Sequence, residues 1–230
     1  MRYSNKPNRE LSFAEDTIES AVIDLSILFQ KYPFYFINEE TLRNMLYAKI
    51  IRKFPEKQLY IKKPNGEEFI SGSIHTDPYI VRGDSKHDSP DLLIFYKRNG
   101  KGNPILTTHR FSGCKNSEGK YRRKVWFYAT NKQAGTTLDD RIFIEIKVNK
   151  NFKKLSYKKR KKIFKDIGKM QRWNHSKSYM LYFDRSNLLN HSSLSKIRDF
   201  IGSKECLIDF IYSGYSDSDE KGRYLHLKSS

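Results

Sequence analysis

The sequence predicts an α/β fold in which a mixed central β-sheet is flanked by helices. Two segments near the N-terminus, 13–30 and 39–53, repeat apolar residues at helical spacing. Short apolar runs at 92–96, 142–144 and 178–184 are rich in β-branched and aromatic residues, which is typical of buried strands. The chain has 230 residues, enough for a substantial core, so we expect residues 1–230 to form a single domain.

The N-terminal helices are expected within residues 13–54. The first helix carries an apolar stripe and ends before Pro33; the stripe consists of Ile18, Ala21, Val22, Leu25 and Leu28. The second helix begins at Glu39, with Asn38 as a plausible cap, and stops before Pro55.

Residues 55–96 and 141–212 are expected to form the core. Segments 57–63 and 67–74 predict a hairpin around the turn Pro64-Asn65-Gly66, and 75–88 is polar enough to be a loop. Between the two parts of the core, residues 97–140 contain several glycines and one convincing strand, 124–129. We therefore predict a β-rich, hairpin-like insertion there.

The C-terminal part of the core alternates helices and strands. A basic helix is expected within 149–172, a strand at 178–184, a helix at 188–201 and a last strand at 206–212. Residues 213–230 are rich in Ser, Asp and Gly and predict a flexible tail.

Charge and cysteine usage limit the class of protein. The 44 Lys and Arg residues against 26 Asp and Glu give a net charge of +18, which favours a polyanionic partner, nucleic acid first and an anionic membrane second. The two cysteines have no metal-ligand spacing and are expected to be free thiols in a reducing cytoplasm. No signal peptide or membrane-length apolar run is visible, so we expect an intracellular, cytoplasmic protein without a membrane partner.

The chain lacks the sequence signatures of several enzyme classes. The six histidines are scattered without zinc spacing. The chain contains no Walker loop, nucleophile elbow or Gly-rich dinucleotide fingerprint, so no organic cofactor is expected.

One group of polar residues interrupts the apolar strands. Asp91 precedes the run 92–96, and Glu145 and Lys147 stand two residues apart in the run that begins at 142. Because side chains alternate along a strand, Glu145 and Lys147 point to one face, while Ile144 and Ile146 point to the other. If the two strands pair, the three polar residues converge. Burying them is costly, which suggests a divalent-metal site beside a cation.

Pro90-Asp91, followed after a gap by Glu145-Ile146-Lys147, resembles the PD-(D/E)XK motif of the restriction-endonuclease-like nucleases. The basic helix and the strand 178–184 that follow also resemble that superfamily, and the resemblance spans roughly residues 38–184. It implies a single nuclease domain with a restriction-endonuclease-like core. The implied activity is a Mg²⁺-dependent endonuclease on DNA, in restriction, repair or defence, with Mn²⁺ able to substitute.

The resemblance also implies roles for individual residues. Asp91 and Glu145 would bind the metal, with the carbonyl of Ile146 as a third oxygen ligand. Lys147 would orient the attacking water or neutralise phosphoryl oxygens. Family members often add an acid from the helix before the first motif strand, and here either Glu39 or Glu40 would supply it. An ordinary helix N-terminal acid explains each of these two equally well.

Two basic segments are candidate nucleic-acid-binding surfaces. The segment 149–172, which follows the motif, is rich in Lys and Arg and contains a single acid, Asp166. This excess of positive charge predicts contacts to a phosphate backbone, although most charge runs form solvated faces. In the insertion, basic residues beside Trp126 could hold phosphates and stack on bases, or form an ordinary solvated hairpin. The candidates are Lys150, Lys153, Lys154, Lys158, Lys159, Arg160 and Lys162, and in the insertion Arg122, Arg123 and Lys124.

Other readings of the same sequence remain open. The three motif residues also fit a strand entered through an Asp turn and a surface Glu/Lys pair on an edge strand. A non-catalytic nucleic-acid-binding protein, an RNase and a transposase-type end-cleaving subunit are the functional alternatives. If each chain carries one site, double-strand cleavage would favour a homodimer.

Overall fold

The computed structural model of the chain consists of sheets and helices joined by segments that are not described. The described residues are 9–36, 38–54, 59–62, 68–71, 74–76, 79–81, 87–88, 90–95, 110–115, 121–128, 141–149, 157–170, 177–185, 191–202, 207–215 and 223–229. The predicted turn 64–66 and the first eight residues lie outside them.

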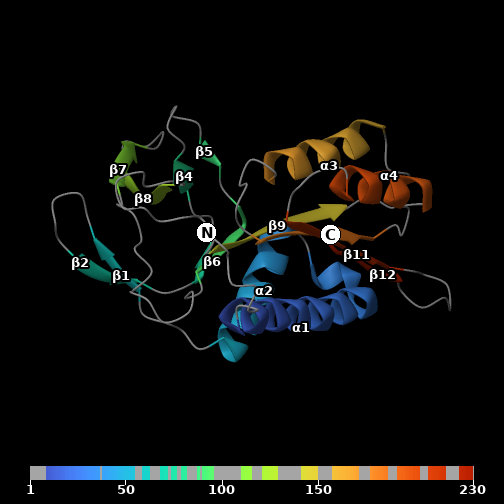
Figure 1. Ribbon diagram of the computed structural model, residues 1–230, viewed down its shortest axis with the longest axis horizontal. Coiled ribbons are helices and arrows are strands. Elements are labelled where there is room, and N and C mark those ends of the chain that lie inside the picture. The colour runs from blue at the N-terminus through green and yellow to red at the C-terminus, as the bar shows by residue number, and fades with distance from the viewer. Residues whose placement is uncertain are drawn as a thin grey trace, which may run out of the picture.

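A six-stranded mixed sheet forms the centre of the fold (Figure 1). Its strand order is β12-β11-β10-β9-β6-β3. The three central strands β9, β10 and β11 are parallel, and the others pair antiparallel. This mixed sheet confirms the predicted fold class. The bounds are β3 (Ile74–Thr76), β6 (Leu92–Phe95), β9 (Arg141–Asn149), β10 (Lys177–Asp184), β11 (Ile208–Gly214) and β12 (Arg223–Leu227).

Two helices cover each face of this sheet (Figure 1). On one face lie α1 (Arg9–Lys31) and α2 (Glu39–Lys53), joined through the short 3₁₀ helix η1 (Pro33–Tyr35). On the other lie α3 (Tyr157–Met170) and α4 (His191–Gly202). Asn38 caps α2, because its side chain accepts a hydrogen bond from the Thr41 N–H at 2.8 Å. No helix in these described ranges is both long and apolar enough to cross a membrane.

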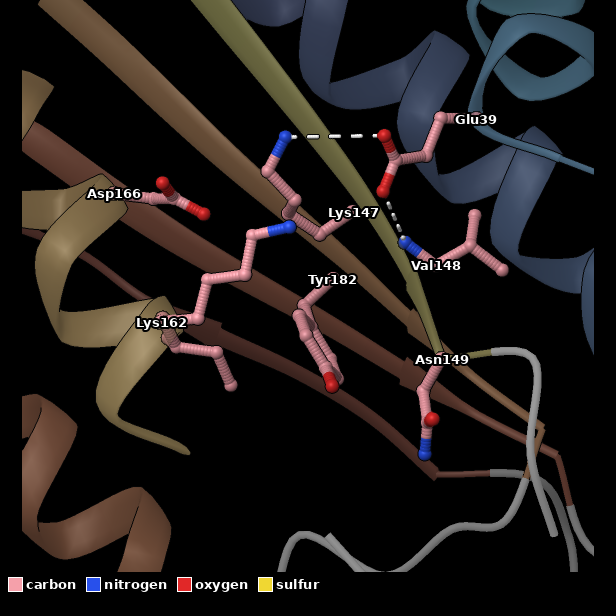
Figure 2. A pocket seen from close by; sticks show the side chains of 8 residues that line it. Glu39, Lys147, Val148, Asn149, Lys162, Asp166 and Tyr182 are labelled. Carbon is pink, nitrogen blue, oxygen red and sulfur yellow. Dashed lines mark hydrogen bonds and ion pairs between the residues drawn. The ribbon is translucent and has the colours of Figure 1, made fainter. Parts of the chain in front are cut away.

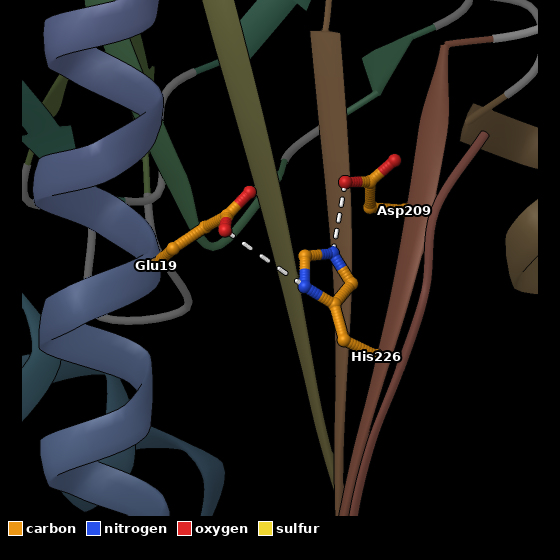
Figure 3. A group of neighbouring side chains, drawn as sticks. All are labelled: Glu19, Asp209 and His226. Atoms are coloured by element: carbon orange, nitrogen blue, oxygen red, sulfur yellow. Dashed lines mark hydrogen bonds and ion pairs between the residues drawn. The ribbon is translucent and has the colours of Figure 1, made fainter. Parts of the chain in front are cut away.

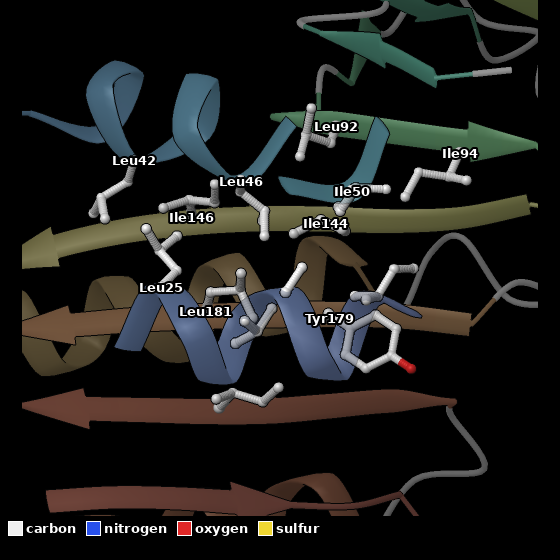
Figure 4. Close-up of a cluster of buried hydrophobic side chains, with 14 of the residues drawn as sticks. Leu25, Leu42, Leu46, Ile50, Leu92, Ile94, Ile144, Ile146, Tyr179 and Leu181 are labelled. Carbon is white, nitrogen blue, oxygen red and sulfur yellow. The ribbon is translucent and has the colours of Figure 1, made fainter. Parts of the chain in front are cut away.

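Strand alternation divides the core into two layers. Ile142, Ile144 and Ile146 of β9 pack in the layer under α1 and α2, with Leu42 and Leu46 of α2 (Figure 4). The intervening residue Phe143 packs in the opposite layer, with residues of α3 and α4. Glu145 and Lys147 follow the parity of Phe143, so their side chains lie on the α3 face.

The insertion forms part of a second, four-stranded sheet. In it, β7 (Arg110–Lys115) and β8 (Tyr121–Tyr128) pair antiparallel, in keeping with the predicted hairpin-like, β-rich insertion. The sheet is completed by β4 (Tyr79–Val81) and β5 (His87–Asp88), which lie outside the insertion in sequence.

Three local expectations differ from the structure. Segment 75–88 was predicted as a loop, but it contains the end of β3 together with β4 and β5. Segment 67–74 was predicted as one strand, but it divides between β2 (Glu68–Ser71), which pairs with β1 (Leu59–Lys62), and β3, which pairs with β6. Residues 55–96 therefore contribute only β3 and β6 to the main sheet. Strands this short have no readable period, and their pairing depends on distant partners.

In place of the flexible tail expected from residue 213, the chain continues the main sheet. β11 runs to Gly214, and Arg223–Leu227 forms the edge strand β12 on it. Leu227 is buried, and Leu225 packs against the layer under α3 and α4. The strand β12 is only five residues long, and it is preceded by many Ser, Asp and Gly residues, so its pattern of buried residues is hard to recognise in the sequence.

We expect Leu181→Ala to lower the free energy of unfolding by about 2–5 kcal/mol, because Leu181 is fully buried in the central strand β10. Urea denaturation followed by circular dichroism measures the change. Ile27→Ala is the control: Ile27 of α1 is largely exposed, so its loss should stay within about 0.5 kcal/mol. Equal losses in both variants would contradict this assignment of the core.

Candidate functional site

The pairing of β6 with β9 brings the two halves of the sequence motif together. These strands are antiparallel, with Leu92 opposite Ile144. Asp91 directly precedes β6, and its side chain reaches β9, where Oδ2 accepts a hydrogen bond from the Ile146 N–H. The two acids, separated in sequence by the whole insertion, therefore lie close together where β6 pairs with β9.

Short contacts link the motif residues. The Ile146 N–H donates a hydrogen bond to Asp91 Oδ2 at 2.6 Å, and Lys147 Nζ lies 2.8 Å from Glu145 Oε1. Arg43 of α2 approaches Asp91 from the other side, with Nη1 3.9 Å from Oδ1. Asp91, Glu145 and Lys147 thus form one cluster of two acids and one base.

The electrostatics of the cluster show an excess of buried negative charge around Asp91. Burial, and then the charge of Glu145, raise the pKa of Asp91 to about 6, against the opposing effects of the Ile146 N–H and Lys147. Burial alone would lower the pKa of Lys147, but attraction to Glu145 outweighs it and raises this pKa to about 12. Lys147 is therefore a cation at neutral pH, and the carboxyl of Asp91 takes up a proton unusually easily.

The donor set fits a hard divalent cation. Glu145 is buried, and within the described part of the chain its Oε2 has no hydrogen-bond partner. A second carboxylate with a raised pKa lies beside it. Mg²⁺ binds through one or two carboxylates and keeps several waters, so the two acids match its needs.

The structure separates the two candidate acids of α2. Glu39 Oε2 lies 3.9 Å from Lys147 Nζ, and Glu39 Oε1 accepts a hydrogen bond from the Val148 N–H at 3.4 Å. Glu40 is 67% exposed and pairs with Arg43 at 3.8 Å. Only Glu39 therefore reaches the same stretch of β9 as Lys147.

A small, half-open pocket lies beside Lys147, between the end of β9 and helix α3 (Figure 2). Its lining combines acids, lysines and an aromatic ring: Glu39, Lys147, Val148, Asn149, Lys162, Ile163, Asp166 and Tyr182. A pocket with two lysines next to paired carboxylates can accept an anionic group close to a metal.

Of the predicted nucleic-acid-binding residues, the structure places the side chain of Lys162, which is exposed on α3 and lines the pocket. Lys150, Lys153 and Lys154 lie outside the described residues. The structure describes only the backbone of the others, on α3 and β8: Lys158, Lys159, Arg160, Arg122, Arg123 and Lys124.

Sequence reasoning missed three polar residues of the pocket: Asn149, Asp166 and Tyr182. Asn149 follows Lys147 at a spacing of two on β9, so extending the strand alternation would have found it. Its amide is held by Asp184, with Nδ2 2.9 Å from Oδ1. Asp166 is the single acid of a basic helix, which was the only signal. Tyr182 gave none, because only the pairing of β10 with β9 sets it beside Lys147.

A second charged cluster lies on the other face of the sheet, against α1 (Figure 3). Ligand atoms of Glu19, Asp209 and His226 lie within 4.8 Å of one another. Asp209, however, is already satisfied: Oδ1 accepts from Lys177 Nζ at 2.8 Å and from the Ser229 N–H and hydroxyl at 2.9 Å, and Oδ2 lies 2.9 Å from His226 Nε2.

These contacts decide the charge state of Asp209. Burial would raise the pKa of its carboxyl, but the hydrogen bonds from His226, Lys177 and Ser229 outweigh burial and hold it well below the usual range. The cluster therefore needs no cation, and it ties β11 and β12 to the rest of the sheet.

Comparisons with known proteins found one similar solved structure and no related sequence. No protein-family model matches the chain, and no curated protein matches its sequence. Among solved structures, the chain is similar to NucC of E. coli MS115-1 in its cAAA-bound form, with 12% sequence identity and a TM-score of 0.39. The match covers 97% of this chain and 86% of that chain. Similarity at this level assigns neither family nor function.

We expect Asp91→Asn to raise the free energy of unfolding of the metal-free protein by about 1–3 kcal/mol at about pH 8. The folded pKa of Asp91, about 6, lies above its ordinary value of 3.8. Its contribution to stability is therefore fully present below about pH 4 and is lost as the pH rises through 6.

Urea denaturation in EDTA at both pH values measures this effect. The gain of Asp91→Asn should shrink to a small fraction at about pH 4. The control is Asp24→Asn, an exposed acid of α1, which should show no such gain at pH 8. A variant less stable than wild type at pH 8 would show that Asp91 is not a strained, buried charge.

Proposed function

We propose that the chain is a metal-dependent phosphodiesterase that cleaves DNA. The observation that supports this proposal is the closeness of Asp91 and Glu145 where β6 pairs with β9, with Lys147 2.8 Å from Glu145. Two adjacent carboxylates, one with an unpartnered buried oxygen, beside a cation and a pocket are the parts that phosphodiester hydrolysis needs.

Asp91 and Glu145 would hold Mg²⁺, or Mn²⁺ in its place. When bound, the ion would polarise the scissile phosphate and acidify a bound water. The Ile146 N–H points at Asp91. Because the N–H and C=O of one strand residue point to the same side, the Ile146 carbonyl faces Asp91 too, which supports it as a third oxygen ligand.

Lys147 would act as an electrostatic group. With a pKa of about 12 it stays protonated at neutral pH, so in this state it is a donor and not a general base. Its three N–H groups can hold a phosphoryl oxygen and orient the attacking water. Glu39 is the acid of α2 that we assign to the site, as a positioning residue for Lys147 and the end of β9.

DNA is the proposed substrate because the chain carries a net charge of +18 and the pocket joins Lys147 to Lys162 of the basic helix α3. A run of cations along α3 would follow the phosphate backbone away from the cleaved bond, and binding would weaken with salt. Base contacts that would define sequence specificity are not part of this proposal.

The main test is a plasmid-nicking assay with Mg²⁺, Mn²⁺ or EDTA. We expect cleavage with either metal, none in EDTA, and a loss of about 100-fold or more in Asp91→Asn, Glu145→Gln and Lys147→Ala. Lys53→Ala is the matched control, because it removes an exposed lysine of α2 that pairs with Asp24 of α1. It should keep full activity.

The same assay separates the alternatives. DNA binding without cleavage under every metal condition would favour a non-catalytic binding protein. Cleavage of an RNA of the same length in preference to DNA would favour an RNase. Cutting that survives both Asp91→Asn and Lys147→Ala would end the proposed mechanism.

Glu39 and Glu40 form a natural pair of variants. We expect Glu39→Gln to lower kcat/KM by about 10-fold or more, because it removes the charge beside Lys147. Glu40→Gln should leave cleavage within about twofold, since it breaks only an exposed ion pair with Arg43. Steady-state cleavage of a labelled duplex measures both. The reverse order would transfer the role to Glu40.

A further inference from the structure

The connection between α1 and α2 exposes three large aromatic side chains on one turn. We call Tyr32, Phe34 and Tyr35 the aromatic turn; their exposed fractions are 38%, 62% and 68%. Aromatic side chains bring a large apolar area, and leaving three of them at the surface together is unusual for residues without a binding role.

The turn is held firmly by its own anchors. Pro33 and Phe36 are buried, and the Phe36 ring lies 5.6 Å from that of Phe29 in the core. Arg185, which follows β10, donates hydrogen bonds to the carbonyls of Pro33, at 3.2 Å, and Phe36. The rings are therefore presented on a fixed backbone, so that a ligand would lose little affinity to ordering the turn.

Two cations accompany the rings. Lys31 Nζ lies 5.1 Å from the centre of the Tyr32 ring, and the Arg185 guanidinium lies 5.6 Å from that of Phe34. Tyr32 and Tyr35 stack on each other at 5.0 Å and an interplanar angle of 13°. Stacked rings with cations over two of the three aromatic faces match a ligand that has both π faces and negative charges, which describes a nucleotide strand.

The aromatic turn adjoins the pocket. Tyr35 precedes Glu39 by four residues, and the Arg185 N–H donates to the Asn149 carbonyl at 3.4 Å. Glu39 and Asn149 both line the pocket that contains Lys147 (Figure 2). A strand whose phosphate enters the pocket would therefore reach the turn within a short length.

We propose that the aromatic turn stacks unpaired bases next to the scissile phosphate. Bases in a duplex have their faces covered by neighbours, so only a single-stranded, frayed or branched segment can use the rings. The inference rests on the proposed function for its class of ligand and adds to it a preference for DNA that has an unpaired region next to the cleaved bond. A second copy of the chain is the competing occupant, which the net charge of +18 disfavours through self-repulsion.

Fluorescence anisotropy in EDTA tests binding without cleavage. The probes are a labelled oligothymidine and a fully paired duplex of the same length. We expect Tyr35→Ala to weaken binding of the single strand about fivefold or more and to leave the duplex unchanged. Tyr35→Phe should restore binding, because it keeps the ring.

The control for an exposed aromatic is Tyr224→Ala, on the edge strand β12, which should bind both probes like wild type. The salt dependence of single-strand binding should keep its slope in Tyr35→Ala, because stacking releases no counterions. Thermal melting should show that the variant is folded, as expected for a residue that is 68% exposed.

Unchanged single-strand binding, or an equal loss on both probes, would overturn the inference. So would light scattering that shows a dimer in wild type and a monomer in Tyr35→Ala, with binding of the single strand intact. The proposed function is tested separately. If single-strand binding follows this pattern but no metal-dependent cleavage occurs, the inference about the aromatic turn stands and the proposed nuclease activity is wrong.

Discussion

The antiparallel pairing of β6 with β9 brings the carboxylates of Asp91 and Glu145 close together in a largely buried part of the sheet. Asp91 stands just before β6 and Glu145 lies in the middle of β9, so the register that pairs Leu92 with Ile144 also sets the acids side by side. Glu145 cannot turn to the other face without moving Ile144 and Ile146 out of the core. The apolar layer under α1 and α2 therefore fixes the geometry of the polar residues on the opposite face.

The fold contains two charged clusters, which differ in how far opposite charges and hydrogen bonds stabilise their carboxylates. Asp209 accepts hydrogen bonds from Lys177 and Ser229 and pairs with His226, and its pKa is lowered, so it stabilises the native state at neutral pH. Asp91 has a raised pKa and costs stability instead. Lys147, Arg43 and the Ile146 N–H therefore offset the negative charge of Asp91 and Glu145 only in part.

The lining of the pocket beside Lys147 comes from four separate parts of the chain. The N-terminus of α2 supplies Glu39, the end of β9 supplies Lys147 and Asn149, α3 supplies Lys162, and β10 supplies Tyr182. The aromatic turn leads directly into α2, and Arg185 joins it to the end of β9. The hydrogen bonds of Arg185 thus connect the aromatic turn to Asn149, a residue that lines the pocket.

The sequence alone determined the elements whose signals are local. The first two helices and the strands β6 and β9, predicted from the runs 92–96 and 142–144, follow from apolar spacing, as does the shared face of Glu145 and Lys147. The Asn38 cap follows from its residue type before a helix. It could not determine which strands pair, so β3, β4, β5 and β12 were missed, and Tyr182 was invisible. The choice between Glu39 and Glu40, adjacent residues in one helix turn, also required the packing of α2 against β9. Local periodicity decides on which face of a strand or helix a side chain lies. Which residues it contacts there depends on how the whole sheet packs.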